Sequence, residues 1–165
     1  MAPPRVSKRT RELDAQGAVV INVLTWEAAA TDNTFALGHA AMLINEGLPS
    51  FIVETLRRDP RVDFATMPVG VLGMAFKADV DDVRDSLSFK LAKLLRFHGA
   101  LVRCSDEFVQ DDSFVSKEEL LATCPIVIVA VPHSAYRRLG VPADTVLVDV
   151  WSVTERAAVP VALAS

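Results

Sequence analysis

The sequence predicts an α/β protein built on a parallel sheet, and two observations carry this prediction. Short apolar runs alternate with helical patterns from residue 69 onward, as in a sheet whose parallel strands are joined by helices. The first of these runs ends in a charged loop that leads into a helix, the arrangement in which open α/β sheets bind ligands. We therefore predict a Rossmann-like parallel sheet flanked by helices and preceded by part of a long apolar helix. The predicted strands are 69–73, 101–104, 126–131 and 146–150.

Length, charge and cysteine content limit the class of protein. The chain has 165 residues, 51% of them hydrophobic, enough for one domain of about 100–200 residues and an appendage. A net charge of −4 argues against a nucleic-acid partner. No apolar run approaches the roughly 18 residues of a membrane span, and no signal-peptide pattern is present, so we expect a cytoplasmic protein without a membrane partner. Cys104 and Cys124 have no metal or redox spacing and are expected to be structural thiols.

An apolar helical pattern precedes the predicted sheet. It begins near Asp32 and presents a broad apolar face that includes Phe35 and Leu37. The Gly47-Leu48-Pro49 sequence is expected to kink the chain because proline lacks the amide donor, with a second helical piece continuing to Leu56. Since this helix has no companion domain of its own, we expect its apolar face to pack against a partner.

Helices are also predicted between the strands. The clearest one has Asp85 or Ser86 as its N-cap and ends at Gly99. A shorter one begins with Ser116 and Glu119 at the spacing of a capping box, in which each residue bonds the backbone amide of the other. The predicted segments are 86–98, 116–123 and a helical turn at 134–139.

The charged loop after the first strand is the candidate ligand site. Lys77 follows that strand closely, and a lysine there suits a phosphate group arriving at the sheet edge. Arg84 offers a planar fork for bidentate contact with phosphate. Both residues also have a simple structural interpretation: Lys77 could pair with Asp79 or Asp81, and Arg84 with Asp81 or Asp82.

Three acidic residues in this loop raise the question of a metal. Asp79, Asp81 and Asp82 could hold a divalent cation, as in a phosphoacceptor receiver domain. However, Lys77 and Arg84 bracket them, which favours a charge-balanced loop in which the acids cap backbone amides. We therefore predict no metal site, and a metal-dependent receiver-like module is the third choice of function.

Two further patterns are possible cofactor or active-site signals. Gly73-x-Ala75-x-x-Ala78 is a degraded dinucleotide fingerprint, but Asp106 lies too far beyond it, so the domain is not expected to bind NAD by itself. His133 and Tyr136 could be active-site groups, although we favour a strand-end histidine satisfied by local backbone.

Several motifs resemble one enzyme family. Residues 73–86 (GMAFKADVDDVRDS) resemble the start of the C-terminal, UDP-binding domain of the UDP-glucose/GDP-mannose dehydrogenase family, and 37–49 resemble the end of its central helix. Residues 86–91, 132–137 and 148–151 resemble the branch that acts on UDP-N-acetylmannosamine and similar sugars.

The resemblance carries expectations about function. The family comprises NAD-dependent oxidoreductases that oxidise a nucleotide-sugar alcohol to a carboxylate, for polysaccharide precursor synthesis. It implies that Phe76 and Lys77 bind the nucleotide sugar and that Arg84 contacts NAD bound by another domain. It also implies a homodimer formed through the helix at 35–56.

Some family features are not found in this sequence. No cysteine or lysine occupies the region before Phe35 where the family has its nucleophile segment, and the NAD-binding domain is missing, so no catalytic residue is assigned. Trp151-Ser152-Val153 replaces an arginine that some branches carry after the last strand. We expect the nucleotide-sugar-binding C-terminal portion of a UDP-sugar dehydrogenase, with an unrelated or frame-altered N-terminus, inactive without a separate N-terminal half. The alternative is a non-catalytic nucleotide-sugar-binding or assembly module.

These observations predict four parts of the chain. They are an irregular N-terminus that is disordered or unrelated to the family (1–31), the end of the dimerisation helix with a linker (32–67), the UDP-binding domain (68–153) and a tail (154–165).

Overall fold

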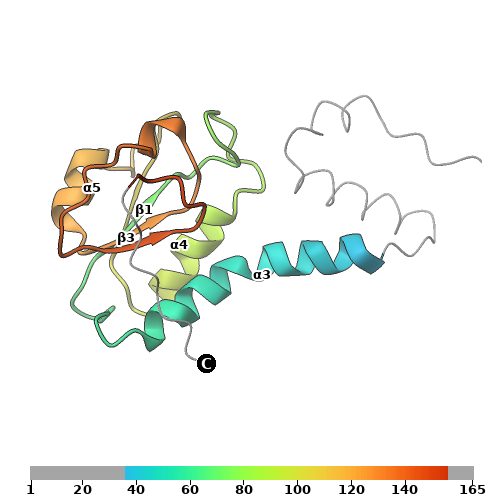
Figure 1. Cartoon of the computed structure of the whole chain (residues 1–165), viewed down its shortest axis with the longest axis horizontal. Coiled ribbons are helices and arrows are strands. Elements are labelled where there is room, and N and C mark those ends of the chain that lie inside the picture. The colour runs from blue at the N-terminus through green and yellow to red at the C-terminus, as the bar shows by residue number, and fades with distance from the viewer. Residues whose placement is uncertain (1–35, 156–165) are drawn as a thin grey trace, which may run out of the picture. The chain divides into compact units, whose positions relative to one another are not determined.

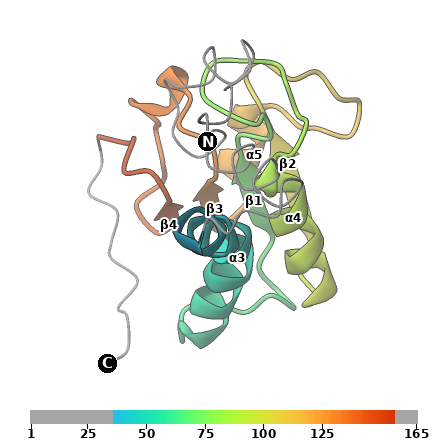
Figure 2. The same ribbon diagram turned by 90° about the vertical axis from the view of Figure 1, so that its right-hand side faces the viewer.

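The computed structural model describes residues 36–155 and contains a four-stranded parallel sheet (Figure 1). The strand order is β2-β1-β3-β4, so the sheet grows outward from β1 in both directions. Figure 2 looks along the strands and shows this order across the sheet. The strands are β1 (Val69–Leu72), β2 (Val102–Ser105), β3 (Ile126–Val129) and β4 (Val146–Asp149). The predicted Rossmann-like class is confirmed, with each strand near its predicted position.

The helices cover both faces of this sheet. Their bounds are α3 (Ala36–Arg58), α4 (Leu87–Phe97), α5 (Lys117–Thr123) and the short 3₁₀ helix η2 (Ser134–Tyr136). Figure 1 shows α4 and α5 on opposite sides of the sheet. Because β1 and β3 are buried along their whole length, their near-continuous apolar sequences fit strands covered on both faces.

The face of the sheet that α5 covers holds a compact apolar cluster. Leu120 of α5 is fully buried there, and a Cβ atom at Gly70 in β1 would collide with the Leu120 side chain. Glycine at position 70 therefore lets α5 pack close to the sheet. The buried members of the cluster are Leu72, Leu120, Cys124, Val127, Val129, Tyr136, Leu139 and Leu147.

The long helix differs from the prediction at one point. α3 continues as a single helix through Pro49, where we expected two helical pieces. A proline inside a helix costs about 3 kcal/mol. Burial of Ile52, Val53 and Leu56 in the following turns offsets that cost. The chain divides into two compact units between Leu48 and Pro49, and the sheet belongs to the second unit.

Some expectations lie outside the described residues, including those for 1–31 and most of the predicted tail. Within residues 36–155, every helix is too short or too polar to cross a bilayer.

The capping residues of the two inter-strand helices are found where the sequence places them. The Ser86 hydroxyl accepts from the Ser88 amide of α4, and the Ser116 hydroxyl accepts from the Glu119 amide of α5 at 3.1 Å. The Glu119 carboxylate instead pairs with Arg103 of β2 at 2.7 Å. The expected return bond of the capping box is replaced because a charged donor is the stronger partner.

Replacing Ser116 with alanine should lower the unfolding free energy by about 1 kcal/mol, since the Glu119 amide loses its acceptor. Urea unfolding followed by circular dichroism measures the change. Ser116→Asp, which restores an acceptor oxygen, is the matched control and should unfold close to the parent. Equal losses in both variants would contradict a capping role.

Candidate functional site

The loop after β1 leaves the sheet through a sharp backbone turn at Gly73. This glycine has φ +90°, and its amide donates to the Ser105 carbonyl at 2.9 Å, which continues the ladder to β2. A Cβ atom at this position would lie 2.6 Å from Val131 Cβ and 2.8 Å from the Val131 amide nitrogen. The loop therefore starts at a place where the backbone conformation and the space both require glycine.

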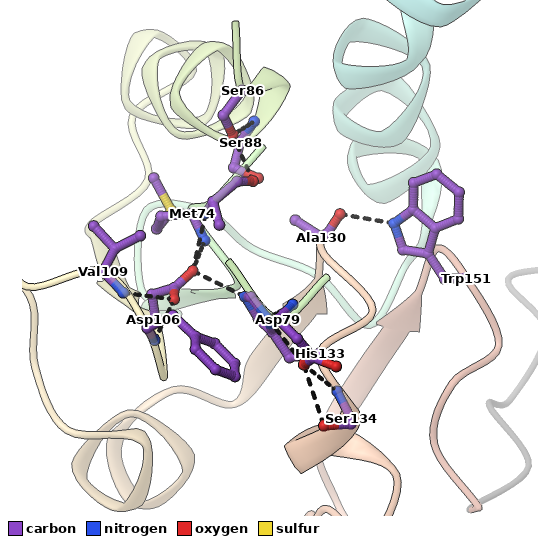
Figure 3. A network of polar contacts seen from close by, with 12 residues as sticks. Met74, Asp79, Ser86, Ser88, Asp106, Val109, Ala130, His133, Ser134 and Trp151 are labelled. Atoms are coloured by element: carbon purple, nitrogen blue, oxygen red, sulfur yellow. Dashed lines mark hydrogen bonds and ion pairs between the residues drawn. The ribbon is translucent and has the colours of Figure 1, made fainter. Parts of the chain in front are cut away.

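The carboxylate of Asp106, directly after β2, holds the start of this loop (Figure 3). Its Oδ2 accepts from the amides of Met74 at 2.5 Å and Ala75 at 2.9 Å. Its Oδ1 accepts from the amides of Phe108 at 2.8 Å and Val109 at 3.0 Å. The Asp106 side chain has no exposed surface, so it joins the ends of β1 and β2 inside the protein.

These contacts determine the charge of Asp106. Burial by itself raises the pKa of this carboxyl, but hydrogen bonds from His133 and from backbone amides outweigh burial and hold the pKa well below its usual range. Asp106 is therefore a carboxylate that accepts hydrogen bonds at both oxygens.

His133, after β3, is the second internal contact of the loop. Its Nδ1 accepts from the Asp79 amide at 2.9 Å, and its Nε2 lies 3.1 Å from Asp106 Oδ2. The imidazole is fully buried beside the rings of Phe108 and Tyr136, with ring centroids 4.9 Å and 5.2 Å away. A backbone amide does bond this histidine, as expected, but it is 54 residues away rather than local, and the second partner is a side chain 27 residues away.

Two of the three loop aspartates, Asp79 and Asp82, have different partners. Asp79, at φ +56°, accepts from the Ser134 amide at 2.9 Å and hydroxyl at 3.2 Å, and the amide bond is the main cause of its lowered pKa. Asp82 pairs instead with Arg84. Within residues 36–155, no group of three or more His, Cys, Asp or Glu side chains is arranged to hold a metal ion.

Phe76, Lys77 and Arg84 come from the same closed loop. The Phe76 amide donates to the Asp82 carbonyl at 2.6 Å, which brings the two ends of the charged segment together. The Arg84 guanidinium forms a fork with the Asp82 carboxylate, with Nε–Oδ1 at 2.9 Å and Nη2–Oδ2 at 2.6 Å. This pair lowers the pKa of Asp82 to about 2, and the charge of Lys77 contributes. Arg84 remains 74% exposed.

Lys77 differs from its simple structural interpretation. In the described part of the chain, its ammonium forms no ion pair within 4.0 Å with Asp79 or Asp81. Asp79 is directed to Ser134, on the β3 side of the loop. The lysine therefore keeps its donors available at the carboxyl edge of the sheet, where ligands bind in open α/β folds.

The sequence patterns did not predict that Asp106 and His133 hold the loop after β1. The sequence patterns relate Asp106 to a dinucleotide fingerprint, and they leave His133 as an active-site group or a locally satisfied residue. The available signal was position: both residues lie shortly after predicted strands, and the carboxyl ends of parallel strands in one sheet lie at the same edge. That edge also contains the backbone amides that follow β1, which need acceptors.

The fold and the charged loop define a Rossmann-like domain with a candidate ligand site at the carboxyl edge of its sheet. Residues 70–156 match the sequence profile of the UDP-glucose/GDP-mannose dehydrogenase family, UDP binding domain. The match covers more than half of the chain, so the chain belongs to this family, and the predicted resemblance is confirmed.

Characterised relatives agree with this assignment. The chain is 25% identical over 123 residues to UDP-N-acetyl-D-mannosamine dehydrogenase from Methanocaldococcus jannaschii, covering 73% of this chain and 28% of the relative. It is 27% identical over 110 residues to the enzyme of the same name from Pyrococcus horikoshii, covering 64% and 26%. The chain thus spans under a third of the length of both relatives.

Solved structures show the same fold. GDP-mannose dehydrogenase from Pseudomonas aeruginosa aligns with a TM-score of 0.68 at 21% identity, covering 86% of this chain and 36% of that one. A UDP-glucose dehydrogenase from Pyrobaculum islandicum aligns with a TM-score of 0.61 at 27% identity, covering 76% and 31%.

Proposed function

We propose that this chain supplies the nucleotide-sugar-binding part of an NAD-dependent UDP-sugar 6-dehydrogenase and does not catalyse alone. The observation that carries the proposal is the match of residues 70–156 to a UDP-binding domain, in which Lys77 is available at the sheet edge. The relatives' names favour UDP-N-acetylmannosamine as the sugar substrate. The proposed setting is the cytoplasm, in the synthesis of polysaccharide precursors.

Lys77 and Phe76 are the proposed substrate ligands. A lysine ammonium is a compact charge on a flexible stem and can donate to the oxygens of a diphosphate. Phe76 is partly buried next to it and presents an aromatic surface to the sugar or the base. The closure of the loop between Phe76 and Asp82 holds both side chains at the same edge.

The residues of this domain fit an NAD site poorly. In dinucleotide-binding domains, the backbone after the first strand approaches the pyrophosphate. Here the corresponding amides of Met74 and Ala75 already donate to Asp106. NAD, whose nicotinamide accepts hydride from the alcohol carbon, is therefore proposed to bind a separate N-terminal half. Arg84 is exposed and oriented by Asp82, and can extend from this domain toward a cofactor held there.

Replacing Lys77 with alanine tests the proposal. We expect UDP and UDP-N-acetylmannosamine to bind about 10- to 100-fold more weakly, since a lost charge-assisted hydrogen bond is worth about 1.5–3 kcal/mol. Calorimetric titration of the purified chain measures this affinity. Lys93→Ala removes the same charge from an exposed position of α4 and should bind like the parent. Equal affinity of the parent and Lys77→Ala would count against the assignment.

A second candidate function is a non-catalytic assembly module. It is favoured by the apolar residues that α3 exposes, among them Leu37 at 78% and Ile44 at 77%. Exposed apolar surface of this kind marks interaction sites, and a homodimer through 35–56 is the proposed assembly. Dimerisation in sedimentation without any affinity for UDP would favour this second function over the first.

A further inference from the structure

We propose that His133 is a positioning residue for the loop that carries Lys77, acting as a neutral imidazole protonated on Nε2. The proposal rests on the proposed function of Lys77 as a substrate ligand. His133 itself is fully buried and presents no surface to a ligand. It acts by fixing the backbone of Asp79, two residues beyond Lys77.

The geometry joins three strand ends through one ring. His133 follows β3, Asp106 follows β2, and Asp79 belongs to the loop that follows β1 (Figure 3). Next to the ring, the Ser134 amide and hydroxyl donate to the Asp79 carboxylate. Asp79 is thus held twice, at its amide by His133 and at its side chain by Ser134. Such contacts support the φ of +56° at Asp79, a region that non-glycine residues adopt rarely and aspartate more often than most.

The partners of the ring assign its tautomer. Nδ1 accepts from the Asp79 amide and therefore carries no hydrogen. Nε2 faces a carboxylate oxygen that already accepts from Met74 and Ala75, so Nε2 must be the donor in that pair. Only the Nε2–H form satisfies both contacts. The reversed tautomer would place two donors face to face at Asp79 and leave Nε2 as an acceptor against Asp106.

Packing prevents the ring from adopting another orientation. Phe108 lies against one side with an interplanar angle of 33°, and Tyr136 meets the ring edge at 80°. Apart from its contact with His133, the loop is largely exposed. Its exposed residues include Asp81, Val83, Arg84 and Asp85. The buried imidazole is therefore an internal anchor for a segment that has few apolar contacts of its own.

This anchoring has a consequence for ligand affinity. A loop already held in its binding conformation loses less conformational freedom when the ligand arrives. Removing the Asp79 contact should therefore loosen residues 77–85 and weaken UDP binding without removing any group that touches UDP.

Three substitutions separate the two hydrogen bonds. In His133→Asn the amide oxygen can take the place of Nδ1, which preserves an acceptor for the Asp79 amide. In His133→Gln the amide nitrogen can take the place of Nε2, which preserves the donor to Asp106. His133→Phe keeps an aromatic ring of similar size against Tyr136 and removes both bonds.

Hydrogen exchange of the full chain provides the first readout and needs no ligand. We expect amides in 77–85 to exchange about 10-fold faster in His133→Gln and His133→Phe, and near the parent rate in His133→Asn, because only Asn retains the Asp79 contact. UDP affinity measured by calorimetry should follow the same order. A merely structural role in the core would instead affect the exchange of β1 and β3 amides in all three variants.

The tautomer is a second readout that requires no variant to fold. The ¹⁵N chemical shifts of the His133 ring in the parent protein distinguish Nε2–H from Nδ1–H, and we expect Nε2–H at neutral pH. An Nδ1–H ring, or equal exchange of 77–85 in the parent and His133→Phe, would overturn the proposal. Failure of the proposed function has a different signature: UDP would bind neither the parent nor any variant, while the exchange and ¹⁵N results would stand.

Discussion

Replacing Gly73 with alanine should lower the unfolding free energy by about 3 kcal/mol or more. The substitution combines two penalties, a side chain at φ +90° and a Cβ atom 2.6 Å from Val131 Cβ. The Val131 amide nitrogen, 2.8 Å away, belongs to the backbone next to β3 and cannot move without disturbing the sheet edge. Thermal and urea unfolding measure the loss, and UDP affinity should fall as well because the Lys77 loop begins here.

Gly99 provides a matched control for this variant. It also has φ +90°, but nothing lies within 4 Å of the position its Cβ would occupy. Gly99→Ala should therefore show the conformational penalty alone, about 1–2 kcal/mol. The difference between the two variants measures the close approach of the β1 loop to Val131. Equal losses would mean that the loop can shift away from Val131 at little cost.

Replacing Asp106 with alanine should have an effect of similar size, about 3–5 kcal/mol. The substitution leaves the His133 Nε2–H and the amides that donate to the carboxylate without their acceptor. Because these donors join the ends of β1, β2 and β3, the loss should also loosen the Lys77 loop. Asp111→Ala, which removes an exposed carboxylate bonded to nearby Ser113, is the control with a small expected effect.

The same carboxylate makes stability depend on acid pH. The pKa of Asp106 is lower in the folded than in the unfolded state, so its contribution is complete above the unfolded value, near 4. That contribution is lost as the pH falls from about 4 toward the folded pKa. Asp79 and Asp82 have lowered pKa values too and add to the decline. In Asp106→Asn the unfolding free energy should change less steeply with pH in this acid range. The slope should decrease by up to the contribution of one bound proton. An unchanged slope would contradict the assignment.

Local sequence patterns were sufficient to predict most of the fold. Apolar runs gave the strands, because a buried parallel strand needs side chains that tolerate burial on both faces. The hydroxyls of Ser86 and Ser116 marked two helix starts, because capping depends on residues only two or three positions apart. The charged loop was found for the same reason, since its composition is visible within nine residues.

The contacts that organise the site could not be predicted in this way. The bonds of His133 to Asp79 and Asp106 span 54 and 27 residues, and they depend on the order of strands in the sheet. Strand order follows from packing of the whole domain, which no short pattern encodes. The choice of Arg103 as the partner of Glu119 has the same origin, because it requires β2 to lie beside α5.

The Asp106 carboxylate also has a consequence for competition between ligands. It is an anion covalently tethered beside the Met74 and Ala75 amides, so its effective concentration there greatly exceeds that of free phosphate compounds in solution. The carboxylate therefore competes with any pyrophosphate group for these two amides. A pyrophosphate group would have to displace this carboxylate before it could bind the two amides.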